Sequence, residues 1–203
     1  ETLLRKTAVD VCVVGDGELI IRDLVEALRK RLATEETFRA VRGICFLDGK
    51  GEFVFTGYRP PLPADELPAP DFSILEEDGS LAHFVPRESP WPDWSGIEPS
   101  GARWTTVITA KGCVARCTFC HRWERGYRFQ PVDRTLDHVR HLKEKYGVGY
   151  VSIGDENFGS DRRGALELAV KLGRLGITWR AAGVRAFTAD PEVIARGIER
   201  HHP

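Results

Sequence analysis

Three of the five cysteines, Cys113, Cys117 and Cys120, lie close together in a C-x3-C-x2-C spacing. They follow Gly112 and residues 105–109, a run rich in β-forming side chains. Thiolates are the preferred ligands of soft transition metals and of iron–sulfur clusters. Three thiols on one short loop after a strand therefore indicate a metal or cluster site.

Several kinds of site compete for these cysteines. Structural zinc needs four ligands, usually as two separated pairs, and no second C-x2-C exists; His121 directly follows Cys120 and is badly placed for the same ion. Residues 117–121 match the C-x-x-C-H pattern of covalent haem, but the sequence has no methionine to serve as axial ligand. A disulfide would leave one thiol unpaired and needs an oxidising compartment. An iron–sulfur cluster fits best, because three thiolates leave one iron open for chemistry.

The composition excludes several partners. A net charge of −1 gives no electrostatic case for nucleic acid or an acidic membrane surface. No apolar run is long enough to cross a bilayer, and residues 1–10 lack the pattern of a secretory signal. With an odd cysteine count, these features predict a cytoplasmic protein. The sequence neither begins with methionine nor contains one, so we expect a trimmed chain or one from which some residues have been lost.

The N-terminal residues predict a βα unit. Residues 8–14 are almost continuously apolar, as expected of a strand buried on both faces of a parallel sheet. A turn at residues 15–18 follows, then a helix with Ile20, Leu24 and Leu28 on one stripe. Gly15 and Gly17 match a dinucleotide fingerprint only weakly, because its third glycine would fall at Ile20.

A hairpin and a proline-rich segment come next. Residues 43–55 predict two β arms around Asp48-Gly49-Lys50-Gly51. Cys12 and Cys45, one in each predicted strand, are interpreted as small core residues. Nine of the twelve prolines lie between residues 59 and 99, which argues against regular helix or interior strand. We therefore expect one domain at 1–58, a linker at 59–103 and a second domain at 104–203.

The second domain shows three successive βα units. Strands are predicted at 105–109, 150–153 and 177–182, and helices at 135–146, 162–175 and from Asp190 onward. Such units form a parallel sheet with right-handed crossovers. Ligands would collect where the strands end, which places the cysteines, residues 154–160 and residues 183–187 at one edge.

The cysteine motif, with Phe119 before its third cysteine and a place after the first strand of repeated βα units, resembles the radical S-adenosylmethionine (SAM) superfamily. Residues 9–18 and the following helix resemble the last strand and helix of an upstream cobalamin-binding domain. The resemblance implies an α/β fold: the C-terminal part of a Rossmann-like cobalamin-binding domain, a Pro-rich linker, and the first half of a radical SAM partial (β/α)6 barrel. The cobalamin domain's D-x-H-x-x-G motif is absent, and three βα units stand where the barrel has six.

The resemblance also implies a function. A [4Fe–4S] cluster held by Cys113, Cys117 and Cys120 would cleave SAM to a 5′-deoxyadenosyl radical, with cobalamin-dependent methyl transfer to an unreactive carbon or phosphorus centre. The alternatives are a cobalamin-dependent radical cyclase or rearrangement enzyme, and a non-catalytic iron–sulfur or zinc protein. The expected partners are a small-molecule substrate and an electron donor such as flavodoxin or ferredoxin, with no nucleic acid and no membrane.

Further residues are implicated in cofactor binding by their match to the family's motifs. Asp155 and Glu156 end the second strand and are suitable acceptors for the ammonium of SAM, although such residues also cap helices. Arg185 could meet a carboxylate, or form a surface ion pair. The implied cofactor-binding set is Phe119, Gly154, Asp155, Glu156 and Arg185 for SAM, and Gly15, Gly17 and Glu18 for cobalamin.

Overall fold

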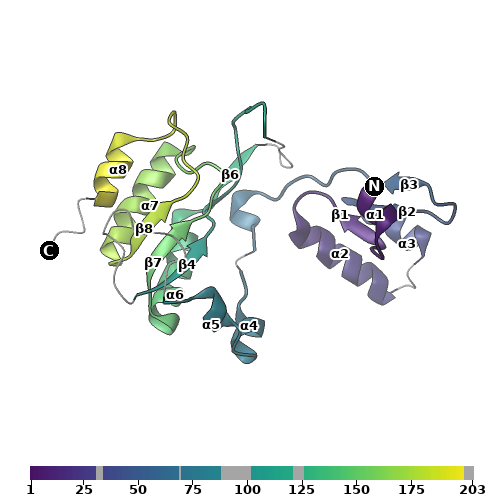
Figure 1. Cartoon of the computed structure of the whole chain (residues 1–203), viewed down its shortest axis with the longest axis horizontal. Helices are drawn as coiled ribbons and strands as arrows, with labels where there is room; N and C mark the ends of the chain where they lie inside the picture. Colours follow the sequence, from purple (N-terminus) through teal and green to yellow (C-terminus); the bar gives the residue numbers. More distant parts are fainter. Residues whose placement is uncertain (31–33, 69, 88–101, 121–125, 199–203) are drawn as a thin grey trace. The chain divides into compact units, whose positions relative to one another are not determined.

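The computed structural model describes residues 1–30, 34–68, 70–87, 102–120 and 126–198. The chain divides into two compact units, Glu1–Pro63 and Ala64–Pro203 (Figure 1). The division falls inside the segment predicted as a linker, between Pro63 and Ala64. Each unit has its own hydrophobic core, and each is described by itself below.

The first unit packs a small sheet against helices. In chain order its elements are α1 (Thr2–Lys6), β1 (Val11–Val13), α2 (Gly17–Lys30), α3 (Glu35–Arg39), β2 (Ile44–Leu47) and β3 (Phe53–Phe55). The sheet has the order β1-β2-β3. Its core contains Ile20 of α2 together with Ile44 and Phe46 of β2.

The expectation of a parallel sheet was wrong for this unit. Strand β1 pairs antiparallel with β2, and its residues are only half-buried. The chain forms a second helix, α3, after α2 and then re-enters the sheet in the opposite direction. An apolar run such as residues 8–14 reports burial but not the direction of the neighbouring strand, so the sequence did not reveal this.

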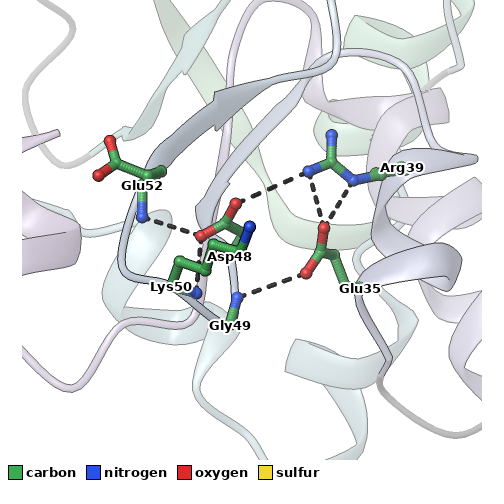
Figure 2. A network of polar contacts seen from close by, with 6 residues as sticks. All are labelled: Glu35, Arg39, Asp48, Gly49, Lys50 and Glu52. Atoms are coloured by element: carbon green, nitrogen blue, oxygen red, sulfur yellow. Dashed lines mark hydrogen bonds and ion pairs between the residues drawn. The ribbon is translucent and has the colours of Figure 1, made fainter.

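The predicted hairpin is confirmed, since β2 and β3 pair antiparallel around residues 48–51. The Asp48 carboxylate accepts hydrogen bonds from the backbone N–H groups of Lys50 and Glu52, both at 2.9 Å. Glu35 of α3 binds the tip of the turn through the N–H of Gly49 at 3.3 Å and also pairs with Arg39 (Figure 2). These contacts attach the hairpin to α3.

The second unit contains a parallel sheet. Its elements are the 3-10 helix η1 (Ala64–Glu66), α4 (Ser73–Glu77), α5 (Leu81–Phe84), β4 (Arg103–Val107), β5 (Ala110–Gly112), β6 (Tyr127–Phe129), α6 (Val132–Tyr146), β7 (Val148–Ile153), α7 (Arg162–Arg174), β8 (Thr178–Ala181) and α8 (Pro191–Ile198). Strands β4, β7 and β8 lie side by side in that order and run parallel. The three predicted βα units are therefore confirmed, with boundaries shifted by a few residues.

The core of this unit lies between the sheet and its helices. Val107, Val151 and Ile153 are buried on the strands. Apolar side chains from the helical stripes complete the core: Leu136, Val139 and Leu142 of α6, and Leu168 and Leu172 of α7. This packing holds the carboxyl ends of the three strands in a fixed relation.

The expectation that the proline-rich segment lacks helix was wrong in part. Helices α4 and α5 occupy residues 73–84, and Leu81 and Val85 are buried in the core of the second unit. The stretch from 73 to 85 contains no proline; Pro70 and Pro86 flank it. Proline excludes helix only where it stands. Residues 88–101 of the predicted linker lie outside the described residues.

A search of the described residues finds no helix that is long and apolar enough to cross a membrane.

The Asp48 turn predicts a pH dependence. Backbone hydrogen bonds from Glu52 and Lys50 hold the pKa of Asp48 below its ordinary value. The ionised carboxylate therefore contributes stability that is present above the ordinary pKa and is lost as pH falls through the folded value. We expect the difference in free energy of urea unfolding between the wild type and Asp48→Asn to shrink between about pH 5 and about pH 3. A difference for Asp48→Asn that is independent of pH would contradict the assignment.

Candidate metal and cofactor site

The cysteine loop lies between two short strands, β5 before it and β6 after it, which pair antiparallel. The sequence pattern does not predict these strands. Strand β5 pairs with β6, with Lys111 opposite Arg128 and Gly112 opposite Tyr127. Gly112 has φ +79°, and a Cβ there would lie 2.4 Å from the carbonyl oxygen of Gly126. Any side chain would force apart the two ends of the loop, so glycine is required immediately before Cys113.

The three cysteines lie on this one loop, and none of them forms a disulfide. Cys113 and Cys117 are half-buried, and Cys120 is exposed. The N–H of Ala115 donates to the Cys113 sulfur at 3.4 Å, and the N–H of Cys120 donates to the carbonyl of Cys117 at 3.1 Å. Among the described residues, no three side chains of the His, Cys, Asp or Glu type converge closely enough to hold a metal ion. The donor set therefore fits a three-thiolate cluster site in number and type, while its sulfurs are not gathered at one point.

Asp155 faces the base of the cysteine loop. The side chain is 4% exposed, and Oδ1 accepts hydrogen bonds from the N–H of Thr109 at 2.6 Å and of Ala110 at 3.0 Å. Oδ2 accepts from the Thr109 hydroxyl. Burial raises the pKa of Asp155, while the hydrogen bonds from Thr109 and Ala110 oppose the rise. These contacts occupy the carboxylate and join the end of β7 to the residues that lead into β5.

Asn157 joins the loop after β7 to the loop after β8. It is 1% exposed, and its Oδ1 accepts from the N–H of Arg185 at 3.3 Å and from the hydroxyl of Thr188 at 3.0 Å. The N–H of Phe158 donates to the carbonyl of Gly183 at 2.7 Å. At Gly183 a Cβ would lie 2.4 Å from the carbonyl oxygen of Asp155, so the two loops are in close backbone contact.

The other implicated residues of the second unit lie at the same strand ends. Glu156 is exposed, in contrast to its neighbour Asp155. At Gly154 a Cβ would lie 2.7 Å from a methyl carbon of Thr106, which explains the glycine by packing. Phe119 is 90% exposed, and the side chain of Arg185 is also exposed.

The implied cobalamin residues lie in the first unit. Gly15, Gly17 and Glu18 form the turn between β1 and the first residues of α2. Gly15 has φ +101°, a conformation that favours glycine. His121, which entered the zinc and haem alternatives, lies outside the described residues.

Two residues of the site were not found from the sequence. The sequence pattern predicts only that Thr109 ends a strand, and it gives Asn157 no role separate from that of its neighbours. Both are nearly fully buried polar residues. A threonine after a run of β-formers and an asparagine in an acidic loop give no sequence signal for partners that lie 28 to 46 positions away.

Comparison with known proteins identifies the family. Residues 107–198 match the family model described as the Radical SAM superfamily. This part of the chain is a radical SAM domain. This match begins at Val107, the last residue of β4, and covers β7, β8, the cysteine loop and the loops that Asp155 and Asn157 join.

Individual relatives extend the similarity into the first unit. The anaerobic magnesium-protoporphyrin IX monomethyl ester cyclase of Cereibacter sphaeroides is 30% identical over 166 residues, which is 81% of this chain and 24% of that protein. The cytidylyl-2-hydroxyethylphosphonate methyltransferase of Streptomyces wedmorensis is 26% identical over 210 residues, covering 91% of this chain and 37% of that protein. The chain thus spans between a quarter and two fifths of the length of these curated relatives.

Solved structures show the same fold. The cobalamin-dependent SAM radical enzyme OxsB, solved with aqua-cobalamin and SAM, matches 83% of this chain and 22% of its own, with a TM-score of 0.55 and 24% identity. The radical SAM methyltransferase TsrM of Kitasatospora setae, solved with cobalamin and a [4Fe–4S] cluster, matches 85% of this chain and 31% of its own, with a TM-score of 0.55 and 18% identity.

Asp155 can be tested as the residue that positions the cysteine loop. Asp155→Ala leaves the buried N–H groups of Thr109 and Ala110 without an acceptor, and each such loss costs about 1–3 kcal/mol. We expect a loss of about 2–4 kcal/mol in the free energy of unfolding, measured in urea. Asp155→Asn keeps an oxygen acceptor at the same place and should lose much less. Equal losses in the two variants would show that hydrogen bonding at this position is not what matters.

Proposed function

We propose that this chain is part of an enzyme that uses a [4Fe–4S] cluster, held by Cys113, Cys117 and Cys120, to cleave SAM to a 5′-deoxyadenosyl radical. The observation that carries the proposal is the loop itself: three cysteines in C-x3-C-x2-C spacing, none of them in a disulfide, which follow the carboxyl end of the first strand of a radical SAM domain. When bound, the cluster supplies the electron that breaks a sulfur–carbon bond of SAM.

The three thiolates would leave one of four irons open for the amino and carboxylate groups of SAM. Glu156, an exposed carboxylate at the end of β7, is the candidate acceptor for the SAM ammonium. Asp155 faces the protein interior and would act by positioning the loop. The exposed Arg185 guanidinium is the candidate partner of a carboxylate, and the exposed Phe119 ring offers an apolar surface beside the third cysteine.

We further propose cobalamin as a second cofactor and methyl transfer to an unreactive carbon or phosphorus centre as the reaction. Support comes from relatives named as a methyltransferase and from structural neighbours solved with cobalamin. Gly15, Gly17 and Glu18 would lie at the edge of the cobalamin site. A cobalamin-dependent cyclase is the second candidate, because the C. sphaeroides relative at 30% identity is named as a cyclase. The substrate would be a small molecule, and the electron would come from a flavodoxin or ferredoxin in the cytoplasm.

The cluster ligands can be tested by anaerobic reconstitution of the protein expressed from the complete reading frame. We expect about four irons and four sulfides at this site, and loss of this cluster on substitution of Cys113, Cys117 or Cys120 by alanine. Cys12→Ala, a cysteine of the first unit, is the matched control and should bind as much iron as the wild type. One zinc per chain with no sulfide would overturn the cluster assignment in favour of a structural zinc site.

SAM cleavage can be tested by its products. Reduction in the presence of SAM should release 5′-deoxyadenosine, and S-adenosylhomocysteine beside it with the true substrate would favour methyl transfer over cyclisation. The role of Glu156 can be tested by SAM binding. Loss of a charge-assisted hydrogen bond costs about 1.5–3 kcal/mol, so Glu156→Gln should weaken SAM binding by about tenfold or more at unchanged iron content. Glu144→Gln, an exposed glutamate on α6, is the control. Unchanged SAM affinity in Glu156→Gln would remove Glu156 from the SAM site.

A further inference from the structure

Two cysteines outside the proposed cluster site stand opposite each other in the first unit. Cys12 of β1 is the direct partner of Cys45 of β2 in the antiparallel register. The N–H of Val14 donates to the carbonyl of Gly43 at 2.7 Å, which makes that facing pair a hydrogen-bonded one. Hydrogen-bonded pairs recur at every second position, so Cys12 and Cys45 form the next one. The Cα atoms of such a pair lie about 5.5 Å apart, within the range that a disulfide spans.

The two thiols lie on the same face of the sheet. Val11 and Val13 pack with Ile44 and Phe46 on the α2 side. Because side chains alternate along a strand, Cys12 and Cys45 both project from the other face. The Cys45 thiol responds to both surroundings: burial raises its pKa, and the neighbouring Cys12 thiol raises it further.

Exposure gives the two thiols different chemical roles. Cys12 is half-buried, whereas Cys45 is buried. An external disulfide can therefore reach the Cys12 sulfur first and form a mixed disulfide there. Cys45 lies beside Cys12 and can attack this mixed disulfide. The raised pKa lowers the fraction of Cys45 that is present as thiolate, and the closeness of the two cysteines offsets this loss because the second step is intramolecular.

We propose that Cys12 and Cys45 form a reversible cross-strand disulfide, a redox site separate from the cysteine loop. The oxidant is a low-molecular-weight disulfide such as oxidised glutathione. The Cys12 thiolate attacks one of its sulfurs, a mixed disulfide forms, and one thiol departs. The Cys45 thiolate then attacks the Cys12 sulfur and releases the second thiol. In sum, two protein thiols lose two electrons and two protons, and one external disulfide becomes two thiols.

The consequence of oxidation would be a covalent link between β1 and the β2–β3 hairpin. It closes a loop that contains α2 and α3 and fixes the strand that leads into the Gly15–Glu18 turn. The proposal does not rest on the proposed function, since neither cysteine belongs to the second unit.

The test is peptide mapping of the protein expressed from the complete reading frame, reconstituted anaerobically and then equilibrated with oxidised glutathione. After alkylation of free thiols, trypsin releases Cys12 in residues 7–22 and Cys45 in residues 43–50, because it cleaves after Lys6, Arg22, Arg42 and Lys50. We expect these two peptides to appear joined, two hydrogens lighter than their sum, and to separate on treatment with dithiothreitol. The cluster cysteines fall in other peptides, so loss of the cluster cannot imitate this result.

Matched variants separate the two chemical steps. In Cys45→Ala the first step remains and the second is impossible, so glutathione should stay attached to Cys12. In Cys12→Ala, Cys45 should remain reduced. Circular dichroism establishes that both variants are folded. Recovery of both wild-type peptides in alkylated form, or of a lasting glutathione adduct on Cys12 in the wild type, would overturn the proposal.

Discussion

A buried carboxylate organises the loop edge of the second unit. Asp155 comes directly after β7 and its adjacent glycine, yet it binds Thr109 and Ala110, which follow β4. Parallel strands place their carboxyl ends together, but they leave the loops after them unconstrained. One aspartate that accepts three hydrogen bonds removes this freedom at the point where the chain turns toward the cysteines. The rest of the site depends on that constraint, because Gly112 and Cys113 follow Ala110 within three residues.

The burial of Asp155 has a cost that its hydrogen bonds offset. Removal of a carboxylate from water disfavours its charge, and the raised pKa reflects this. Two backbone N–H groups and one hydroxyl return part of the lost solvation. Asn157 acts in the same way, because its buried amide oxygen accepts hydrogen bonds from Arg185 and Thr188 in the loop after β8. Buried polar side chains, not apolar contacts, thus set the relative positions of the three loops.

The sequence predicts those parts of the structure that depend on residues close together in the chain, and it fails where the interacting residues are far apart. The three βα units were predictable because the stripe of Leu136, Val139 and Leu142 and the N-cap at Asp190 are local patterns. The cysteine motif was predictable because its spacing is itself the signal. The pairing of β5 with β6 was not, since three residues on either side of a loop carry no periodicity. The direction of β2 against β1 depended on the short helix α3, which the sequence analysis did not foresee. The partners of Asp155 and Asn157 lie too far along the chain for any local rule.

The short helices α4 and α5 of the proline-rich segment belong to the second unit, which therefore begins well before its first strand. Leu81 and Val85 complete the core beneath the parallel sheet, although they precede its first strand by about twenty positions. A recombination event that joined a foreign upstream domain at residue 104 would leave that core open to water. A crossover between Pro63 and Ala64 would transfer the sheet together with the residues that cover it. The second unit is therefore longer than its parallel sheet alone, and it begins before α4.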